Sequence, residues 1–358
     1  MTSPPTARGP RLRDCGVRLG RLHPGPLNAI TDVAGVAVGH VTVWRDEPDP
    51  PEGRGVARTG ITAVVPHSPA ALLREPVPAG GAVLNGAGEM TGFIQVSEWG
   101  VLDSPVYLTS THAVGRVYDG AVAAAVAADP RVGVDDVVIP LVAECDDSRL
   151  SDARVVQVEA ADVSRALEAA SPGPVSEGAV GAGAGMIAFG HKAGIGTASR
   201  ELPSGGIVGV LVLANFGSRR DLRVDGVPVG RALSKADEDE SRVAGSCIAV
   251  VAADVPLSAH VLTRAARRAG LGLARVGSVA HHGSGEIFIA FSTEGSADGV
   301  DRDVVDDLFL GVVEATEEAA LNALWAAPDV QGRAGRVVPG LPHDEVLELI
   351  AAQGRWPT

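Results

Sequence analysis

Short apolar runs, bounded by glycine, proline or charged residues, recur along this chain and predict β-strands. Several of these runs are apolar at nearly every position, which is typical of strands that are buried on both faces. The predicted strands cover residues 34–44, 60–66, 106–109, 137–142, 207–214, 248–253 and 287–292. Strands are therefore concentrated in the middle of the chain, where the core of the protein is expected.

Apolar residues at intervals of three and four predict helices between and after these strands. The predicted helices cover residues 113–128, 258–269, 302–325 and 344–353. The first is expected to end before Asp129-Pro130, because a residue that precedes proline disfavours helical geometry. Helices that alternate with strands in this way predict an α/β protein whose sheets are covered by helices. The chain contains no evident linker, so we expect residues 1–358 to form one domain.

One hydroxyl, that of Ser246, stands at the start of a predicted buried strand and follows Gly245. If the bond between these two residues were cut, Ser246 would carry both a nucleophilic Oγ and a free α-amine. That amine, with an ordinary pKa of about 8, is able to act as the base for the hydroxyl. Glycine fits the preceding position because it lets the backbone bend for attack on its own carbonyl. The same dipeptide is common in simple turns, so the hypothesis needs support from other residues.

Three other segments supply side chains that would complete such a site. Asn215 ends the strand at 207–214 and carries an amide that is able to donate to an oxyanion. Ser284 and Glu286 lie two residues apart in an extended segment, so they project on the same face and can move a proton together. Lys192 is the one lysine in a glycine-rich stretch with few charges, and it is a candidate partner for an oxyanion or a carboxylate.

Matching motifs in a fixed order give the chain a family resemblance. They lie at residues 25–40, 58–66, 85–92, 109–115, 142–144, 192–200, 214–217 and 283–286. In this order they resemble the L-aminopeptidase/D-esterase family, which includes the β-peptidyl aminopeptidases and has a nylon-oligomer hydrolase as a relative. The serines at 246 and 284 favour the aminopeptidase branch, because the nylon hydrolase uses threonine as its nucleophile and aspartates downstream.

The resemblance implies a precursor that cleaves itself before Ser246. The products would be an α chain of residues 1–245 and a β chain of residues 246–358, which stay folded together. The implied fold is an αββα sandwich related to the ornithine acetyltransferases, and the implied assembly is a homotetramer.

The same resemblance assigns roles to the candidate residues. Ser246 would be the nucleophile, Ser284 and Glu286 would assist it, and Asn215 would belong to the oxyanion hole. Glu144 matches a carboxylate that binds the free amine of the substrate in the members that cleave β-peptides. A carboxylate in a pocket suits that role, because it forms a charge-assisted bond with an ammonium and rejects blocked N-termini.

The chain departs from the family pattern directly after Glu144. Many members continue with Thr-Tyr-Asp-Gly, and their tyrosine lies near the catalytic serine, whereas this chain continues with Cys145, Asp146 and Asp147. Asp146 therefore stands where the tyrosine would be. Its carboxylate replaces a neutral donor and adds negative charge near the forming oxyanion. We expect this change to slow acyl transfer or to alter the preferred substrate.

Composition and charge narrow the classes of partner. The chain has 358 residues with 45 glycines and 3% aromatic residues, so packing must depend on valine, alanine, leucine and close backbone approach. The formal net charge of −14 argues against nucleic acid and anionic membranes as partners. We expect no signal peptide and no membrane span, because no apolar run has the required length. Three cysteines without a metal or disulfide pattern fit the reduced cytoplasm.

Other patterns have simpler explanations. Residues 183–188 formally match a dinucleotide fingerprint, but no strand precedes them and no βαβ unit follows. Cys247 invites comparison with a thiol nucleophile, yet adjacent strand residues face opposite sides. His281 and His282 suggest a metal, but no acidic or histidine partners accompany them at ligand spacing. We therefore expect neither a cofactor nor a metal.

The sequence thus predicts a self-processing serine aminopeptidase or amidase that acts on short peptides, amides or esters. Two alternatives stay open. One is an acyltransferase, in which a second amine replaces water, or an endo-amidase of the same fold. The other is an uncleaved binding or structural protein, which Asp146 keeps open and which predicts no hydrolysis of any aminoacyl anilide or ester. The side chain, stereochemistry and backbone type of the preferred substrate are not determined.

Overall fold

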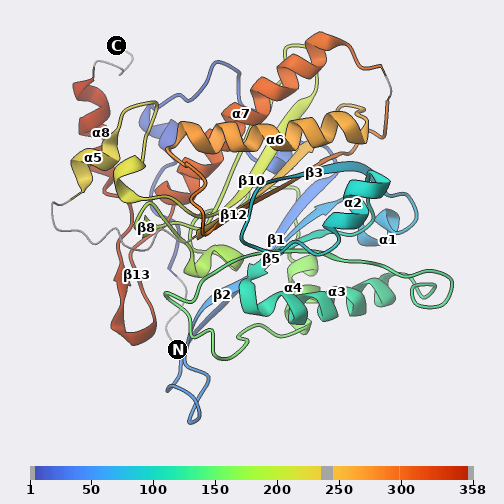
Figure 1. The fold of residues 1–358 in the computed structure, drawn as a ribbon, viewed down its shortest axis with the longest axis horizontal. Coiled ribbons are helices and arrows are strands. Elements are labelled where there is room, and N and C mark those ends of the chain that lie inside the picture. The colour runs from blue at the N-terminus through green and yellow to red at the C-terminus, as the bar shows by residue number, and fades with distance from the viewer. Residues whose placement is uncertain (1–4, 235–244, 298, 354–358) are drawn as a thin grey trace.

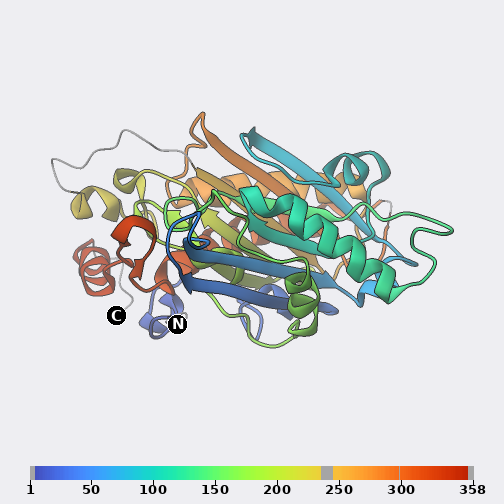
Figure 2. The same cartoon turned by 90° about the horizontal axis from the view of Figure 1, so that it is seen from below.

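The computed structural model of the protein describes residues 5–234, 245–297 and 299–353. The chain is arranged in layers, with two sheets packed face to face and helices covering the outer face of each sheet (Figures 1 and 2). The predicted α/β class and the αββα order of layers are therefore confirmed. None of the described helices is both long and apolar enough to cross a membrane.

The larger sheet has six strands, and its centre is formed by the two strands that carry the candidate serines. The order is β4 (Val101–Leu102), β3 (Val77–Gly86), β12 (Ser284–Ser292), β11 (Gly245–Ala253), β10 (Ile207–Asn215) and β9 (Ile195–Glu201). The central pair β11 and β12 is parallel, and all other neighbours are antiparallel. Strands β3 and β9 were not predicted, because glycine and proline interrupt their apolar pattern.

The smaller sheet has four strands in the order β1 (Val36–Asp46), β2 (Val56–Pro66), β5 (Val106–Ser110) and β6 (Leu141–Cys145). Its last two strands are parallel, and the others are antiparallel. Strand β6 begins at Leu141, so most of the strand predicted at 137–142 is irregular and the actual strand runs on to Cys145. Because of this extension, Glu144 lies near the C-terminal end of the strand.

Four helices cover the two sheets. Helices α6 (Ala259–Arg275) and α7 (Arg302–Trp325) lie on the larger sheet, whereas α3 (Val114–Ala128) and α4 (Ala161–Glu168) lie on the smaller one (Figure 1). Three of these were predicted, but α4 was not. The remaining elements are α1 (Pro69–Leu72), α2 (Phe93–Trp99), α5 (Val229–Leu233), α8 (His343–Ala352), β7 (Ile187–Ala188), β8 (His191–Lys192), β13 (Val330–Gln331) and β14 (Val337–Val338).

Alternation along the strands divides the core into layers. In β11, Ile248 and Val250 face the smaller sheet, whereas Cys247 and Ala249 face the helices α6 and α7. Burial of both faces explains why the sequence of this strand is apolar at nearly every position.

Glycines allow the helices to approach the larger sheet closely. A Cβ on Gly196 of β9 would stand 2.0 Å from the carbonyl oxygen of Ala319 in α7. A Cβ on Gly80 of β3 would stand 2.4 Å from the backbone nitrogen of Thr263 in α6. Backbone contact thus replaces large side chains, as the low aromatic content suggested.

Candidate active site

Ser246 lies at the beginning of β11, between the ends of two neighbouring strands. Its register partner in β10 is Asn215, and its partner in β12 is Gly285. Alternation turns the Ser246 side chain toward the smaller sheet, on the same face as Ile248, and it is 3% exposed. The structure therefore brings the predicted nucleophile beside the predicted oxyanion donor.

Gly245 is required at its position by a close approach of β10. A Cβ on Gly245 would stand 2.2 Å from the carbonyl oxygen of Asn215, so no side chain fits there. The close approach of the neighbouring strand is thus one reason for glycine at this position.

Ser284 and Glu286 form a buried hydrogen-bonded pair at the start of β12. The hydroxyl of Ser284 donates to Oε1 of Glu286, which confirms that the two side chains share a face. The second oxygen, Oε2, is buried and has no hydrogen-bond partner within the described part of the chain. Burial raises the pKa of Glu286, although the bond from Ser284 and the charge of His281 oppose the shift. One oxygen of this carboxylate is therefore available to a new donor.

The strand register places this pair beside the peptide bond that precedes Ser246. Ser284 pairs with Gly245, and Glu286 pairs with Cys247. Paired residues of parallel strands face the same side, so Ser284 and Glu286 lie on the opposite face from the Ser246 side chain. The pair is thus placed to bind the nitrogen of Ser246 rather than its hydroxyl.

Asn215 is held by backbone groups at both ends of its carboxamide. Its Oδ1 accepts from the backbone nitrogen of Ile187 at 3.0 Å, and its Nδ2 donates to the carbonyl oxygen of Asp146 at 3.0 Å. These two bonds fix the orientation of the amide. Among the described residues, Asp146 is the acceptor for Nδ2, so the second hydrogen is able to serve an oxyanion next to Ser246.

Glu144 lies at the end of β6 and comes close to the larger sheet. Its Oε1 accepts from the backbone nitrogen of Glu89 at 3.0 Å, and its Oε2 accepts from the hydroxyl of Thr111. A Cβ on Gly88 would stand 3.1 Å from Oε1 of Glu144 and 3.8 Å from the Cα of Gly285. Gly88 is therefore close both to Glu144 and to Gly285, the register partner of the nucleophile. Burial raises the pKa of Glu144, and the nearby charge of Asp146 adds to the shift.

Asp146 contacts the site through its backbone, and its carboxylate points elsewhere. The carboxylate accepts from the backbone nitrogen of Ser148 at 2.8 Å and from the Ser148 hydroxyl at 2.9 Å. The side chain is exposed. Its carbonyl oxygen is the group that accepts from Asn215. The predicted addition of charge beside the oxyanion is thus moderated by this orientation.

Lys192 is fully buried, and backbone carbonyls occupy its ammonium. Nζ donates to the carbonyl oxygens of Gly183 at 3.0 Å, Met186 at 2.8 Å and Ala193 at 2.5 Å. Burial lowers its pKa to about 7, while the charge of Asp147 opposes the shift. These bonds hold the segment whose next residue, Ile187, orients Asn215. Lys192 therefore supports Asn215 indirectly, through the backbone of residues 186 and 187.

Three residues near the site were not singled out by the sequence argument. Cys145 is buried and interacts with the Ser246 hydroxyl, which lowers a thiol pKa that burial otherwise raises well above its usual value. Thr111 binds Glu144, and Asn85 donates to backbone carbonyls around Ser284. Thr111 and Asn85 both belong to the matching motifs, which was the available signal. Cys247, the alternative nucleophile, faces the helices, as predicted.

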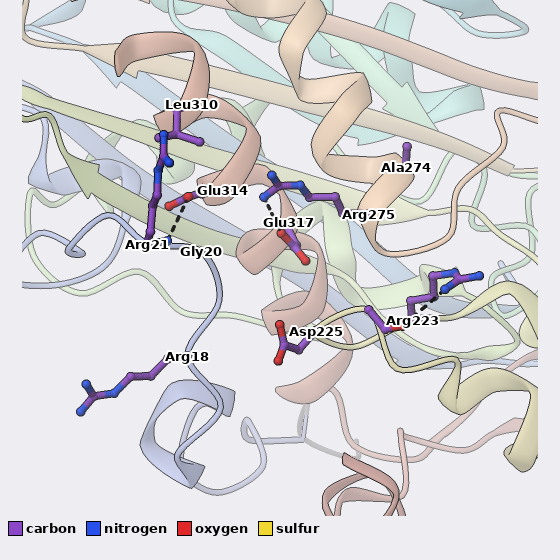
Figure 3. Close-up of a pocket in the computed structure, with 11 residues that line it drawn as sticks. Arg18, Gly20, Arg21, Arg223, Asp225, Ala274, Arg275, Leu310, Glu314 and Glu317 are labelled. Carbon is purple, nitrogen blue, oxygen red and sulfur yellow. Dashed lines mark hydrogen bonds and ion pairs between the residues drawn. The ribbon is translucent and has the colours of Figure 1, made fainter. Parts of the chain in front are cut away.

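A cavity of about 720 Å³ lies away from these residues, at the C-terminal end of α6 (Figure 3). Its floor includes Glu314 and Glu317 of α7, and Arg275 forms an ion pair with Glu317 at 3.0 Å. None of the candidate catalytic residues lines this cavity. In the part of the chain that the structure describes, no group of three or more His, Cys, Asp or Glu residues is able to hold a metal ion.

Known proteins resemble this chain over almost its whole length. The sequence pattern of Peptidase family S58 matches residues 28–338. The chain is 41% identical to the beta-peptidyl aminopeptidase BapA of Sphingosinicella xenopeptidilytica, over 96% of this chain and 92% of that protein. A solved beta-aminopeptidase of Burkholderia sp. is 42% identical and has a TM-score of 0.87, over 97% of this chain and 100% of that one. The L-aminopeptidase D-ala-esterase/amidase of Ochrobactrum anthropi, described as a variant of the Ntn hydrolase fold, is 38% identical with a TM-score of 0.87, over 98% of this chain and 100% of that one.

Proposed function

Because the chain belongs to peptidase family S58, it is a hydrolase of peptide or amide bonds, and we propose that it is a self-processing serine aminopeptidase. The nucleophile in this proposal is Ser246, released by cleavage of the bond to Gly245. The observation that carries the proposal is the position of Ser246 between Asn215 on one strand and the Ser284–Glu286 pair on the other. The names of the relatives support the aminopeptidase activity.

Cleavage begins with attack of Ser246 Oγ on the carbonyl carbon of Gly245. The resulting oxyanion accepts a hydrogen bond from Nδ2 of Asn215. The C–N bond then breaks, and the nitrogen of Ser246, oriented by Ser284 and Glu286, takes up the proton of the hydroxyl. An ester then links Gly245 to Oγ. Water hydrolyses this ester and leaves a carboxylate on Gly245 and a free amine on Ser246.

Substrate cleavage repeats these steps with the new amine as base. The α-amine of Ser246 accepts the proton of Oγ while Oγ attacks the substrate carbonyl, and it then gives that proton to the leaving amine. Ser284 and Oε2 of Glu286 hold the amine in place through hydrogen bonds. Water attacks the acyl ester by the same route and releases the product.

Specificity for a free N-terminus is assigned to Glu144. Its buried carboxylate and Gly285, the partner of the nucleophile, both lie close to Gly88, and an ionised carboxylate there binds the ammonium of the substrate. Replacement Glu144→Gln is expected to raise KM for free aminoacyl anilides about 10- to 100-fold, since a charged hydrogen bond contributes about 1.5–3 kcal/mol. N-acetylated substrates are the control, because their poor turnover is expected to stay unchanged. The raised pKa of Glu144 predicts that amine binding weakens as the pH falls through that pKa.

The decisive experiment is the intact mass of purified protein. We expect two polypeptides, residues 1–245 and 246–358, from the wild type, and one uncut polypeptide with the same circular dichroism from Ser246→Ala. Hydrolysis of aminoacyl p-nitroanilides is expected to be lost in that variant. A wild type that stays uncut after long incubation, or a Ser246→Ala variant that is still cut, rules the proposal out.

The two polypeptides are proposed to remain one domain. Strands β11 and β12 belong to the second polypeptide, and they lie between β3 and β10 of the first within a single sheet. Separation would expose apolar surface on both faces of that sheet. Co-elution of both polypeptides in gel filtration checks this expectation.

The assembly and the compartment are further parts of the proposal. We expect a homotetramer, which light scattering coupled to gel filtration measures. We expect residence in the reduced cytoplasm, supported by three cysteines that are all free of disulfide bonds. Cell fractionation with an antibody to the protein checks the compartment.

A further inference from the structure

Asn85 lies at the end of β3, opposite the carboxylate that assists the nucleophile. In the antiparallel register its partner is Glu286, and the next pair joins Val83 to Ile287. Leu84 is therefore an extra residue, which forms a β-bulge between the two pairs. A bulge redirects the side chains at a strand end, and bulges are frequent next to active sites.

The side-chain amide of Asn85 bridges the turn at residues 281–284, which leads into β12. Nδ2 donates to the carbonyl oxygen of His281 at 2.7 Å and to that of Ser284 at 2.6 Å, with the carbonyl oxygen of His282 at 3.5 Å. The backbone nitrogen of Ser284 also donates to the carbonyl oxygen of His281 at 2.8 Å. The side chain thus fixes both ends of the turn on whose last residue the assisting hydroxyl stands.

The 281–284 turn sets the orientation of the Ser284 hydroxyl and, through it, of the Glu286 carboxylate. Ser284 is the first residue of β12, and its hydroxyl is bonded to Glu286, whose Oε2 is buried without a partner among the residues that the structure describes. A rotation of the turn would move the hydroxyl and the carboxylate together, because they are bonded to each other. Displacement of a catalytic group by about 1 Å is enough to cost about 100-fold in rate.

We propose that Asn85 is a positioning residue that locks the 281–284 turn, so that Ser284 and Glu286 face the amine that cleavage creates on Ser246. The inference rests on the proposed function and adds a residue that acts through the pair without touching the substrate. The Asn85 carboxamide is also close enough to Glu286 to help hold the pKa of that carboxyl down, although its Nδ2 donates to the carbonyl oxygens of His281 and Ser284 and makes no full hydrogen bond to Oε2.

The test compares Asn85→Ala with the wild type in chain cleavage and in the hydrolysis of an aminoacyl p-nitroanilide. We expect the processing rate and kcat to fall about 10- to 100-fold, because the pair is displaced. KM is expected to stay within about 2-fold, since the amine site at Glu144 is unaltered. The acid limb of the kcat–pH profile is expected to move to higher pH, because the pKa of Glu286 rises when the amide is lost.

Two further variants separate positioning from a general loss of stability. Asn85→Ser keeps a hydroxyl donor at this position and is expected to recover part of kcat and of the pH profile. It also serves as the test protein if Asn85→Ala does not fold. Asn322→Ala is the matched control, because Asn322 in α7 donates a buried amide to the carbonyl oxygen of Thr197 at 3.0 Å. It is expected to lower stability without a change in kcat or in the pH profile.

Each outcome decides between the two proposals. A wild type that is cleaved and active, together with an Asn85→Ala variant of unchanged kcat and pH profile, overturns the role of Asn85 and leaves the proposed function standing. A wild type that is never cleaved overturns both. An Asn85→Ala variant that loses stability as Asn322→Ala does, with kcat unaltered, shows that Asn85 only stabilises the fold.

Discussion

The ends of strands β10 to β12 and the underside of helix α7 both bury ionisable side chains, but these side chains are satisfied to different degrees. At the strand ends, the carboxylate of Glu286 uses one oxygen and leaves the other without a partner in the described chain. Under α7, Glu318 accepts from Arg13 at 2.9 and 2.5 Å, from Asn28 at 2.6 Å and from Arg200 at 2.7 Å. Both of its oxygens are occupied.

The network under α7 ties the N-terminal segment to the last long helix. Glu314 accepts from the backbone nitrogen of Arg21 at 3.0 Å (Figure 3). It also accepts from the backbone nitrogen of Leu22 at 3.0 Å and lies 3.4 Å from Nε of Arg200. Arg200 is 0% exposed, so its charge depends on these carboxylates. Burial acts to raise the pKa of Glu318, yet Arg13 and Arg200 hold it below its usual value. This arrangement favours the ionised state and contributes to stability.

The comparison teaches that the carboxylate of Glu318, with both oxygens bonded to buried partners, serves the fold, whereas the carboxylate of Glu286 keeps one oxygen open to a new donor. An unpaired buried acceptor costs free energy, so its retention at Glu286 fits a group that waits for a donor. The donor expected from the proposed function is the amine of Ser246. Four variants test whether this distinction holds.

The largest effect is expected from Glu286→Gln. Removal of the negative charge at the strand ends is expected to slow chain cleavage and to lower kcat about 10²- to 10³-fold, because the carboxylate that orients and stabilises the nitrogen of Ser246 is lost. The free energy of unfolding is expected to stay level or to rise, because the variant loses a desolvated carboxylate. Mass spectrometry, steady-state kinetics and urea unfolding measure the three quantities. A variant with normal kcat would show that the buried carboxylate of Glu286 does not act in catalysis.

The next effect is the reverse case, Arg200→Met under α7. Removal of the central cation takes a fully buried ion-pair partner from Glu314 and from Glu318, which is expected to cost about 3–5 kcal/mol of stability. The kcat of the protein that remains folded is expected to equal that of the wild type. Urea unfolding and active-site titration measure the two quantities, with Arg200→Lys as the control that keeps the charge. A loss of kcat with stability unchanged would contradict the assignment of the network under α7 to stability and of the strand ends to catalysis.

Lys192→Met tests a side chain that lies near the site but has all its donors occupied. We expect the free energy of unfolding to fall by about 1.5–3 kcal/mol, because carbonyl acceptors lose a charged donor. KM is expected to stay within about 2-fold, because Nζ does not face the substrate. Urea unfolding and steady-state kinetics give both values. An increase in KM with stability kept would instead support the substrate-binding role predicted from the sequence.

The smallest effect is expected from Asp147→Asn, and it is measured as the change of the unfolding free energy with pH. Asp147 has an unpartnered buried oxygen, and burial raises its pKa to about 7. Between about pH 4 and pH 7 the native state keeps a proton that the unfolded state has released, so the unfolding free energy falls as the pH rises, by at most about 1.4 kcal/mol per pH unit. The asparagine variant is expected to lose this slope, with kcat unaltered. Urea unfolding at pH 5 and pH 7.5 measures it, and a slope that persists in the variant assigns it to another group.

The layered fold was accessible from local pattern, but two central features were not. Burial of both faces made β10, β11 and β12 evident as apolar runs, and helical spacing made α3 and α7 evident. Strands β3 and β9 were missed because their glycines serve the approach of α6 and α7 rather than strand formation. A position that is chosen for contact with a distant helix carries no local signal of its secondary structure.

The candidate site divides in the same way. The same-face relation of Ser284 and Glu286 follows from the two-residue repeat of a strand, and it was correct. The positions of Asp146 and Lys192 were less accessible. Each has a chemically suitable side chain. The carboxylate of Asp146 is bonded to Ser148, however, and the ammonium of Lys192 is bonded to backbone carbonyls. Side-chain type defines what a residue is able to do, whereas its partners decide what it does.

The sequence by itself determined the kinds of element, the chemistry of the candidate residues and the family. Those properties depend on residue type and on spacings of two to four positions, which the chain carries locally. Only the tertiary structure decided that Ser246 meets Asn215, that Oε2 of Glu286 is left without a partner and that Asn85 spans the turn before Ser284. Such meetings depend on strand register, on one bulge and on the packing of two sheets, because residues far apart in the chain must be brought within hydrogen-bond distance.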